Sequence, residues 1–238
     1  MKIAFISDIH SNIYSLKQVI KSIDSEEVDK IICLGDLVGY ATHPDEVIDL
    51  VRSREIFTIQ GNYDQAVGED LMFCGCDYDT QKEMEKATKS LFWTQENISS
   101  ENKMWLKNLP KDKHLKIKEW DIFLVHGSPR ENNEYLYSDS RAIEEIIEKY
   151  DFDVLLCGHT HLPYFKVYND RYIVNAGSAG KPKHGNPRVN YILLDVKKDE
   201  IDFAIKEVSY NHNQIAGEIE NEEGLPDEFA EIFRTGKA

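Results

Sequence analysis

Five short apolar segments rich in β-branched residues recur along the chain, and each is followed at once by a polar residue that can bind a metal ion. They lie at residues 2–6, 31–35, 56–61, 122–125 and 154–158. Continuous apolar segments, unlike alternating ones, are typical of strands covered on both faces. We therefore expect five buried strands whose ends carry polar, ligand-type side chains.

Helical patterns separate these segments. Ser11 is expected to cap a helix with apolar residues at three- and four-residue spacing, and Pro44 suits the first turn of a second helix. Further helices are expected over about residues 79–97, 100–108 and 139–149. The alternation of strands and helices predicts an α/β fold, in which sites gather beyond the strand ends.

After about residue 163, strands follow one another without intervening helices. Four are expected, at residues 164–168, 171–175, 190–196 and 201–208. They would form two antiparallel hairpins, and a second sheet packed on the first would account for them. The expected turns are Asn169-Asp170 and Lys198-Asp199.

The last part of the chain, from Asn211, is acidic and helical in pattern, and Pro226 starts a short final helix. We expect this part to pack on the body of the protein or to form an oligomer contact. No linker, repeat or low-complexity segment interrupts the sequence. Residues 1–238 are therefore expected to form one domain, whose oligomeric state the sequence leaves open.

Charge and composition exclude several classes of protein. The chain has 28 Lys and Arg against 43 Asp and Glu, a net charge of −15, which argues against a nucleic-acid-binding surface. No apolar segment reaches the roughly 18 residues that a membrane helix needs, and the first segment is too short for a signal peptide. Four cysteines are few for a secreted scaffold. We expect a cytoplasmic protein without a membrane partner.

The polar residues after the five apolar segments form a candidate metal site. Asp8 and His10, like His159 and His161, are separated by one residue, which in an extended segment directs both side chains to the same side. Asp36, Asn62 and His126 complete a set of seven candidate ligands. Carboxylate, imidazole and amide groups suit Mn²⁺, Fe or Zn²⁺, and a bridging carboxylate would let seven ligands hold two ions. Two divalent ions about 3.5–4 Å apart form the clamp used for attack of a bridging hydroxide at phosphorus.

These motifs occur in a fixed order. They are Asp8-x-His10, Gly35-Asp36, Gly61-Asn62-Tyr63-Asp64, His126-Gly127 and Gly158-His159-x-His161, followed downstream by Asn175-Ala176-Gly177-Ser178. In this order they resemble the calcineurin-like metallophosphoesterases. Residues Gly39-Tyr40, 44–48 and 126–130 further resemble the small prokaryotic branch of that family, which includes phosphodiesterases and hydrolases of dinucleoside polyphosphates.

The resemblance implies a four-layer αββα sandwich with two metal sites and a small phosphorylated substrate, of nucleotide type. The first site would comprise Asp8, His10, Asp36 and His161. The second would comprise Asp36, Asn62, His126 and His159, with Asp36 bridging. Asn62 would also contact the substrate.

One position departs from the family pattern. Tyr63 stands where the family usually has a histidine that protonates the leaving group. A phosphoanhydride or an activated diester depends less on such an acid than an alkyl ester does, because its leaving group departs readily as an anion. Asp64 is expected either to support the site by hydrogen bonding or simply to stabilise its turn.

Three cations are candidates for contact with substrate phosphate. Arg130 follows His126 closely and could bind phosphate through two hydrogen bonds, although a surface ion pair is the alternative. Lys181 and His184 belong to a Gly- and Pro-containing loop that either contacts phosphate or is merely solvated.

The motifs leave three functions open: a two-metal phosphoesterase for nucleotide-type substrates, a catalytically weak metal-binding scaffold, and a phosphomonoesterase or protein phosphatase. The complete ligand set favours an enzyme over a scaffold, and Tyr63 weakens the third possibility. The motif Cys74-Gly75-Cys76 could indicate a metal or redox role. A single C-x-C motif is weak evidence for either role, however, and a disulfide at that spacing is strained.

Overall fold

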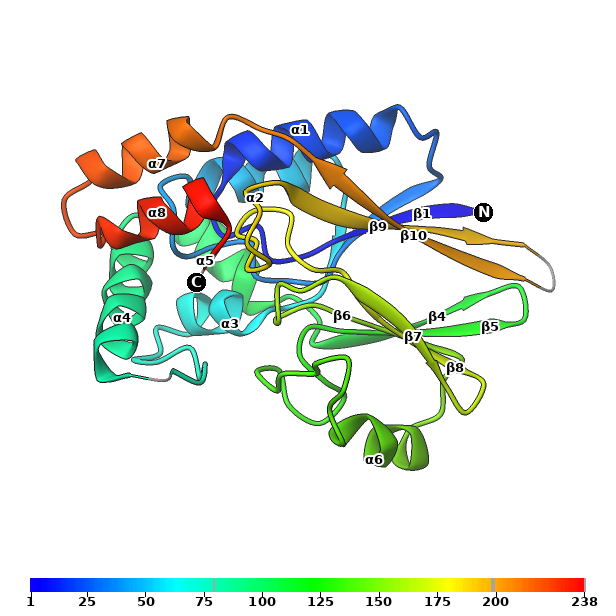
Figure 1. Cartoon of the computed structure of the whole chain (residues 1–238). Coiled ribbons are helices and arrows are strands. Elements are labelled where there is room, and N and C mark those ends of the chain that lie inside the picture. The colour runs from blue at the N-terminus through cyan, green and yellow to red at the C-terminus, as the bar shows by residue number, and fades with distance from the viewer. Residues whose placement is uncertain (79, 198–199, 238) are drawn as a thin grey trace.

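Two mixed five-stranded sheets lie face to face, with helices on their outer faces, in a computed structural model that describes residues 1–78, 80–197 and 200–237 (Figure 1). This arrangement confirms the expected α/β class and the four-layer sandwich. The expected turn at Lys198-Asp199 lies outside the described residues.

The first sheet has the strand order β10-β9-β1-β2-β3. Its strands are β1 (Lys2–Ile6), β2 (Lys30–Cys33), β3 (Phe57–Thr58), β9 (Val189–Val196) and β10 (Ile201–Val208). β1, β2 and β3 run parallel, whereas β9 pairs antiparallel with both β1 and β10. The parallel strands therefore end at the same edge.

The second sheet has the order β4-β5-β6-β8-β7. Its strands are β4 (Asp112–Ile117), β5 (Trp120–Val125), β6 (Val154–Cys157), β7 (Tyr164–Tyr168) and β8 (Arg171–Asn175). β5, β6 and β8 are parallel, and the antiparallel strands β4 and β7 form the two edges.

Two expectations about the strands need correction. The late hairpins do not form a sheet of their own: β7 and β8 extend the second sheet, and β9 and β10 extend the first. The edge strand β4 was not expected from the sequence, because it begins with three polar residues in succession and most of its residues are exposed.

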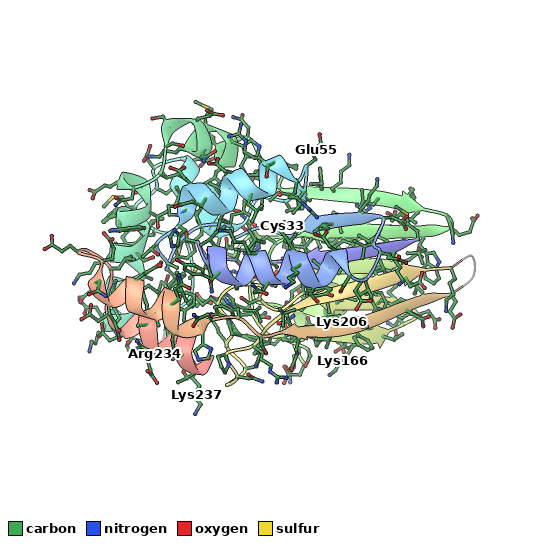
Figure 2. The ribbon with its side chains drawn as sticks, turned by 90° about the horizontal axis from the view of Figure 1, so that it is seen from above. Cys33, Glu55, Lys166, Lys206, Arg234 and Lys237 are labelled. Atoms are coloured by element: carbon green, nitrogen blue, oxygen red, sulfur yellow. The ribbon has the colours of Figure 1, made fainter. Side chains whose placement is uncertain are left out.

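Eight helices are described: α1 (Ile13–Asp24), α2 (Pro44–Ser53), α3 (Asn62–Gly68), α4 (Gln81–Glu96), α5 (Ser100–Lys107), α6 (Ala142–Lys149), α7 (His212–Asn221) and α8 (Glu228–Thr235). α1 and α2 lie side by side over the first sheet, and α6 covers the second (Figures 1 and 2). None of these helices is long and apolar enough to cross a membrane.

The cap of α1 differs from the expectation. Asn12 rather than Ser11 caps the helix, and its side-chain oxygen accepts a hydrogen bond from the backbone N–H of Ser15 at 3.1 Å. Ser11 lies one residue too early and has a φ of 56°, outside the conformation that a capping residue usually adopts. Pro44 occupies the first turn of α2, as expected.

Alternate residues of β1 serve two different hydrophobic cores. Ile3 and Phe5 face the second sheet, where they pack in a cluster that contains Leu124 and Leu156. Ala4 and Ile6 instead join the helices in another cluster. This double burial explains the continuous apolar character of the strand.

The C-terminal helices belong to the body of the protein. Ile215 and Ile219 of α7 and Phe229 and Phe233 of α8 are buried in the same cluster as α1 and α2. Of the two expectations for this part of the chain, packing on the body is confirmed.

We expect Phe233→Ala to lower the free energy of unfolding by about 3–5 kcal/mol, because the substitution leaves a cavity at a fully buried side chain. Phe92→Ala is the matched control, since Phe92 on α4 is 41% exposed. Denaturant unfolding of both variants tests this expectation. Equal losses of stability would show that α8 is not part of the cooperative core.

Candidate metal centre

The loops that follow β1, β2, β5 and β6, together with the start of α3, meet at one edge of the sandwich. They bring together the seven candidate ligands Asp8, His10, Asp36, Asn62, His126, His159 and His161. All seven side chains are buried. Both sheets contribute, so the site depends on the face-to-face packing of the whole fold.

The ligand loops have an unusual backbone. Asp8, His10, Asp36, His159 and His161 all have φ values between 49° and 64°, the left-handed region that is uncommon for residues other than glycine. The pairs Asp8-x-His10 and His159-x-His161 are therefore not extended. This corrects the expectation that was based on their spacing. Such strained residues cluster at functional sites, where the surrounding structure holds them in place.

Two glycines let the loops come together. A Cβ atom on Gly35 would lie 2.5 Å from the backbone nitrogen of Gly61, and one on Gly61 would lie 2.2 Å from Asp36. No side chain fits at either position. This close approach places Asn62 beside Asp36 and His126.

The first group of candidate ligands comprises Asp8, His10 and His161. Nε2 of His161 lies 3.3 Å from Asp8 Oδ1 and 3.3 Å from Nε2 of His10. Such separations fit neighbouring ligands around one ion with metal–ligand distances of about 2.0–2.2 Å.

The second group comprises Asp36, His126 and His159. Nε2 of His126 lies 3.4 Å from Asp36 Oδ2 and 3.1 Å from the side-chain oxygen of Asn62. Asp36 Oδ2 is also 3.7 Å from Nε2 of His10 in the first group. One carboxylate oxygen thus lies between the two groups.

Backbone carbonyls orient three of the histidines. Nδ1 of His10 donates a hydrogen bond to Val38 O at 2.9 Å, and Nδ1 of His126 donates to Leu34 O at 2.7 Å. Nδ1 of His161 donates to the carbonyl of Lys181. Because a carbonyl can only accept, Nδ1 carries the proton and Nε2 faces the centre of the site, the arrangement typical of metal-binding histidines.

The unpaired atoms of the site also fit metal ions. Asp8 Oδ1 and His159 Nε2 are buried without a hydrogen-bond partner among the described residues. Buried polar atoms normally have a partner, because losing hydration without one is costly. One cation in each group would supply a partner for these two atoms.

Burial also shifts the pKa values of the candidate ligands. It raises the pKa of Asp8 to about 6 and lowers the pKa of His10 and His159 to about 3. Burial acts to raise the pKa of Asp36 as well, but attraction to His126 holds it below the usual range. The low pKa values of His10 and His159 keep these imidazoles neutral, as metal binding requires.

Asp64 holds the loops of the second group together. Its carboxylate accepts hydrogen bonds from the backbone N–H groups of Asp36, Leu37 and Gly61 at 2.8, 2.9 and 3.0 Å. The side chain thus supports the loop of Asp36 and also stabilises the turn at Gly61, the two roles between which the sequence left a choice.

The segment after β8 holds the loops of the first group. Ser178 Oγ donates a hydrogen bond to Asp8 O at 2.7 Å, and Asn175 Nδ2 donates to Gly158 O at 2.6 Å. Asn190 in turn binds the backbone of Ala176 and Ser178. Asn190 was missed in the sequence because nothing in its local pattern distinguishes it from any other strand residue.

A cavity of about 510 Å³ opens onto both groups. Its walls include the aromatic residues Tyr40, Tyr63, Tyr78, Tyr135, Tyr137 and Phe229 and the lysines Lys86, Lys181 and Lys183. The Tyr135 ring packs against His159 with ring centroids 4.1 Å apart and planes tilted by 38°. Nothing in the sequence distinguishes Tyr135 beyond its place in the loop after His126.

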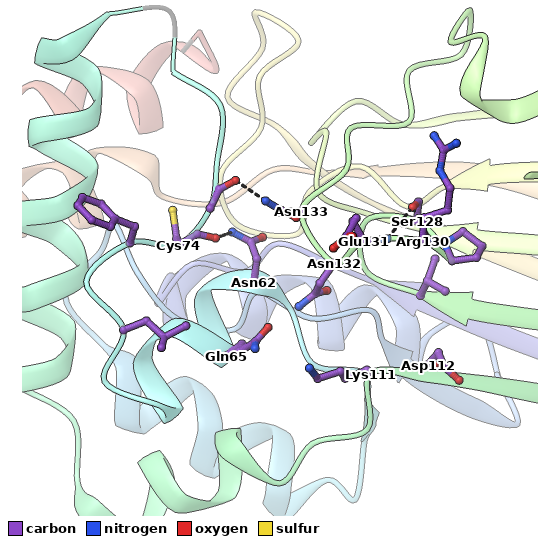
Figure 3. Close-up of a pocket in the computed structure, with 15 residues that line it drawn as sticks. Asn62, Gln65, Cys74, Lys111, Asp112, Ser128, Arg130, Glu131, Asn132 and Asn133 are labelled. Carbon is purple, nitrogen blue, oxygen red and sulfur yellow. Dashed lines mark hydrogen bonds between the residues drawn. The ribbon is translucent and has the colours of Figure 1, made fainter.

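Lys181 lies at this cavity, with Nζ 4.0 Å from the centre of the Tyr40 ring. His184 belongs to the same loop but is not among the described residues that line the cavity. Arg130 lines a neighbouring cavity of about 430 Å³, which Asn62 also borders (Figure 3). Its guanidinium is paired with Glu134 and Glu145, which matches the ion-pair alternative.

Comparison with known proteins points to the same class of protein as the sequence motifs, the metallophosphoesterases. Residues 1–199 match the calcineurin-like phosphoesterase superfamily domain. An uncharacterized protein, MJ0912, of Methanocaldococcus jannaschii is 31% identical over 84% of this chain and 85% of its own length. The phosphodiesterase MJ0936 of the same organism is 22% identical over 84% of this chain and 96% of its own length.

A solved structure shares nearly the whole architecture. The crystal structure of a metallophosphoesterase from Sphaerobacter thermophilus superposes with a TM-score of 0.77 at 27% identity and covers 99% of both chains. The chain is a member of the calcineurin-like phosphoesterase superfamily, and it is by family a metal-dependent phosphoesterase.

We expect Asp64→Asn to weaken Mn²⁺ binding by about 10- to 100-fold, because an amide cannot accept all three backbone hydrogen bonds that hold the Asp36 loop. Calorimetric titration of the metal-free protein measures this change. Asp45→Asn is the control, since Asp45 accepts hydrogen bonds from Ser99 and Asn102 away from the site. Equal Mn²⁺ affinity in both variants would contradict a supporting role for Asp64.

Proposed function

We propose that the protein hydrolyses phosphodiester or phosphoanhydride bonds of nucleotide-type substrates, such as dinucleoside tetraphosphates, with two bound divalent transition-metal ions. The main support is the pair of buried ligand groups with Asp36 Oδ2 between them, at the floor of an aromatic- and lysine-lined cavity. Mn²⁺, Fe and Zn²⁺ all suit these ligands.

Asp36 would be the ligand shared by the two metal sites, because its Oδ2 lies between the two groups. Asp8, His10 and His161 would complete the first site, and Asn62, His126 and His159 the second. When bound, the two ions would activate water as the nucleophile and neutralise charge on the phosphoryl oxygens. Asn62 also borders the adjoining cavity, but its Nδ2 already donates to Cys74 O and Cys76 Sγ, so contact with a phosphoryl oxygen would require the amide to give up one of these partners.

Lys181 and Lys183 are suited to the remaining phosphate groups of a polyphosphate. Neither lysine forms an ion pair within the described part of the chain, whereas Lys86 is paired with Glu228 at 3.0 Å. In a protein with a net charge of −15, Lys183 and the ions would concentrate anion attraction at one place, whereas burial lowers the pKa of Lys181, which would gain its charge beside a bound phosphate. His184 and Arg130 would contribute only if their loops moved toward the cavity.

The aromatic walls favour a nucleobase next to the phosphates. Tyr135 and Tyr137 stack with ring centroids 5.8 Å apart and nearly parallel planes, and Tyr137 is 45% exposed. A base stacked on an aromatic face gains about 1–3 kcal/mol. This combination of lysines with aromatic faces supports a nucleotide over a simple phosphate ester.

Tyr63 restricts the choice of leaving group. Its ring lies edge-on to His10, with centroids 5.5 Å apart, and burial raises the pKa of its hydroxyl well above the ordinary value. Such a hydroxyl is a poor proton donor at neutral pH. Substrates whose leaving group departs as a stable anion, such as a nucleotide, therefore fit this site better than alkyl phosphates.

We expect the purified protein with Mn²⁺ to convert diadenosine tetraphosphate to ATP and AMP. Asp36→Ala should lower kcat/KM by at least about 10³-fold, because loss of a bridging ligand removes several kcal/mol of transition-state stabilisation. Asp202→Ala, at an exposed position on β10, is the control. Products are separated by anion-exchange chromatography. Equal activity of the Asp36 variant and the wild-type protein would refute the two-metal assignment.

We expect Tyr63→His to raise hydrolysis of alkyl phosphodiesters selectively, by about 10²-fold or more, because the imidazole can protonate a poor leaving group. Hydrolysis of an aryl diester should change much less. Tyr63→Phe is the matched control: if the hydroxyl is no acid, this variant retains wild-type rates on both substrates. A large loss in Tyr63→Phe would instead identify Tyr63 as the acid.

A further inference from the structure

A pair of thiols lies directly beside Asn62. The sulfur atoms of Cys74 and Cys76 are 3.0 Å apart, brought together by a turn at Gly75, where φ is 77°. Asn133 Nδ2 donates a hydrogen bond to the carbonyl of Gly75, which fixes the turn from the opposite side of the cavity (Figure 3). The other two cysteines, Cys33 and Cys157, are fully buried in the sheets.

This turn sets the orientation of the Asn62 amide. Nδ2 of Asn62 donates to the carbonyl of Cys74 at 2.9 Å and to the sulfur of Cys76 at 3.1 Å. The opposite atom of the amide, Oδ1, points to His126 Nε2 at 3.1 Å. The C-x-C turn therefore determines where the proposed ligand oxygen of Asn62 lies.

Cys76 is the more accessible of the two thiols, since it is partly exposed whereas Cys74 is only 9% exposed. Cys74 and Cys76 line a cavity of about 180 Å³, and Cys76 also lines the larger cavity that contains the metal-ligand groups. A disulfide bond is about 2.05 Å long, so bond formation would draw the sulfurs together by about 1 Å. The sulfur of Cys76 would then move relative to Asn62 Nδ2.

We propose that Cys74 and Cys76 form a reversible dithiol–disulfide site that reacts with low-molecular-weight disulfides and, through Asn62, weakens the second metal site when oxidised. One thiolate attacks the small disulfide and releases one thiol, leaving a mixed disulfide. The second thiolate displaces the remaining thiol, so that two protein S–H bonds are exchanged for one S–S bond and two small thiols are formed.

The short spacing makes this disulfide readily reducible. Strained disulfides have higher reduction potentials and belong to the labile, regulatory class. The pair therefore stays reduced in a reducing environment and closes only when oxidised disulfides accumulate. The effect on the metal site rests on the proposed function, because it requires Asn62 to be a metal ligand.

The first experiment treats the reduced, metal-free protein with glutathione disulfide, followed by alkylation and peptide mass spectrometry. We expect the peptide that contains Cys74 and Cys76 to lose two hydrogens and to escape alkylation, while Cys33 and Cys157 remain thiols. If both Cys74 and Cys76 are still alkylated, or if only mixed disulfides with glutathione form, the proposal is refuted whether or not the protein is a phosphodiesterase.

The second experiment measures Mn²⁺ affinity by calorimetry before and after oxidation. We expect about 10- to 100-fold weaker binding at one of two sites, restored by dithiothreitol, as is usual when a partner of a metal ligand is disturbed. The double variant Cys74→Ser/Cys76→Ser should show no change on the same treatment. Unchanged affinity in the oxidised wild-type protein would overturn the coupling to Asn62, whereas absent Mn²⁺ binding in the reduced protein would count against the proposed function.

Discussion

The site depends on keeping two carboxylates and several imidazoles together out of water. Asp8 and Asp36 are both buried, and Asp36 raises the pKa of Asp8 in addition to the larger effect of burial. Buried like charges are costly unless positive charge compensates them. Three features make the arrangement tolerable: imidazoles between the carboxylates, the backbone N–H groups of His159 and Tyr63 that donate to Asp8 and Asp36, and atoms of Asp8 and His159 that a cation could bind.

The two-sheet architecture provides this concentration of polar groups without disturbing the core. Each ligand loop begins where a buried strand ends, so the apolar side chains stay between the layers and the polar ones gather at a single edge. The left-handed backbone at five of the ligands turns their side chains inward within a very short loop. Glycines at positions 35 and 61 then allow two such loops to touch.

Much of this could be predicted from the sequence, because strand burial and ligand spacing are local patterns. The apolar segments identified the central strands, and the ordered motifs identified the residues that lie together. The sheet to which each late hairpin belongs could not be predicted, since both sheets accept an antiparallel edge. Tyr135 and Asn190 were likewise missed, because their roles arise from long-range contacts with His159 and with the segment after β8. The assignment of the seven ligands to metal ions stays a prediction.

The two halves of the site differ in how firmly they are supported. Asp8 and the loop of His159 and His161 follow strands of the two sheets and are further held by Ser178 and Asn175. The amide of Asn62, in contrast, is oriented by the turn at Gly75, where Cys74 also contacts the Tyr78 hydroxyl and Asn133 binds the Gly75 carbonyl. A displacement of that turn would act directly on the Asn62 amide, which Cys74 and Cys76 contact. If Asn62 holds a metal ion, a change in the turn would therefore reach the proposed second site through this one side chain.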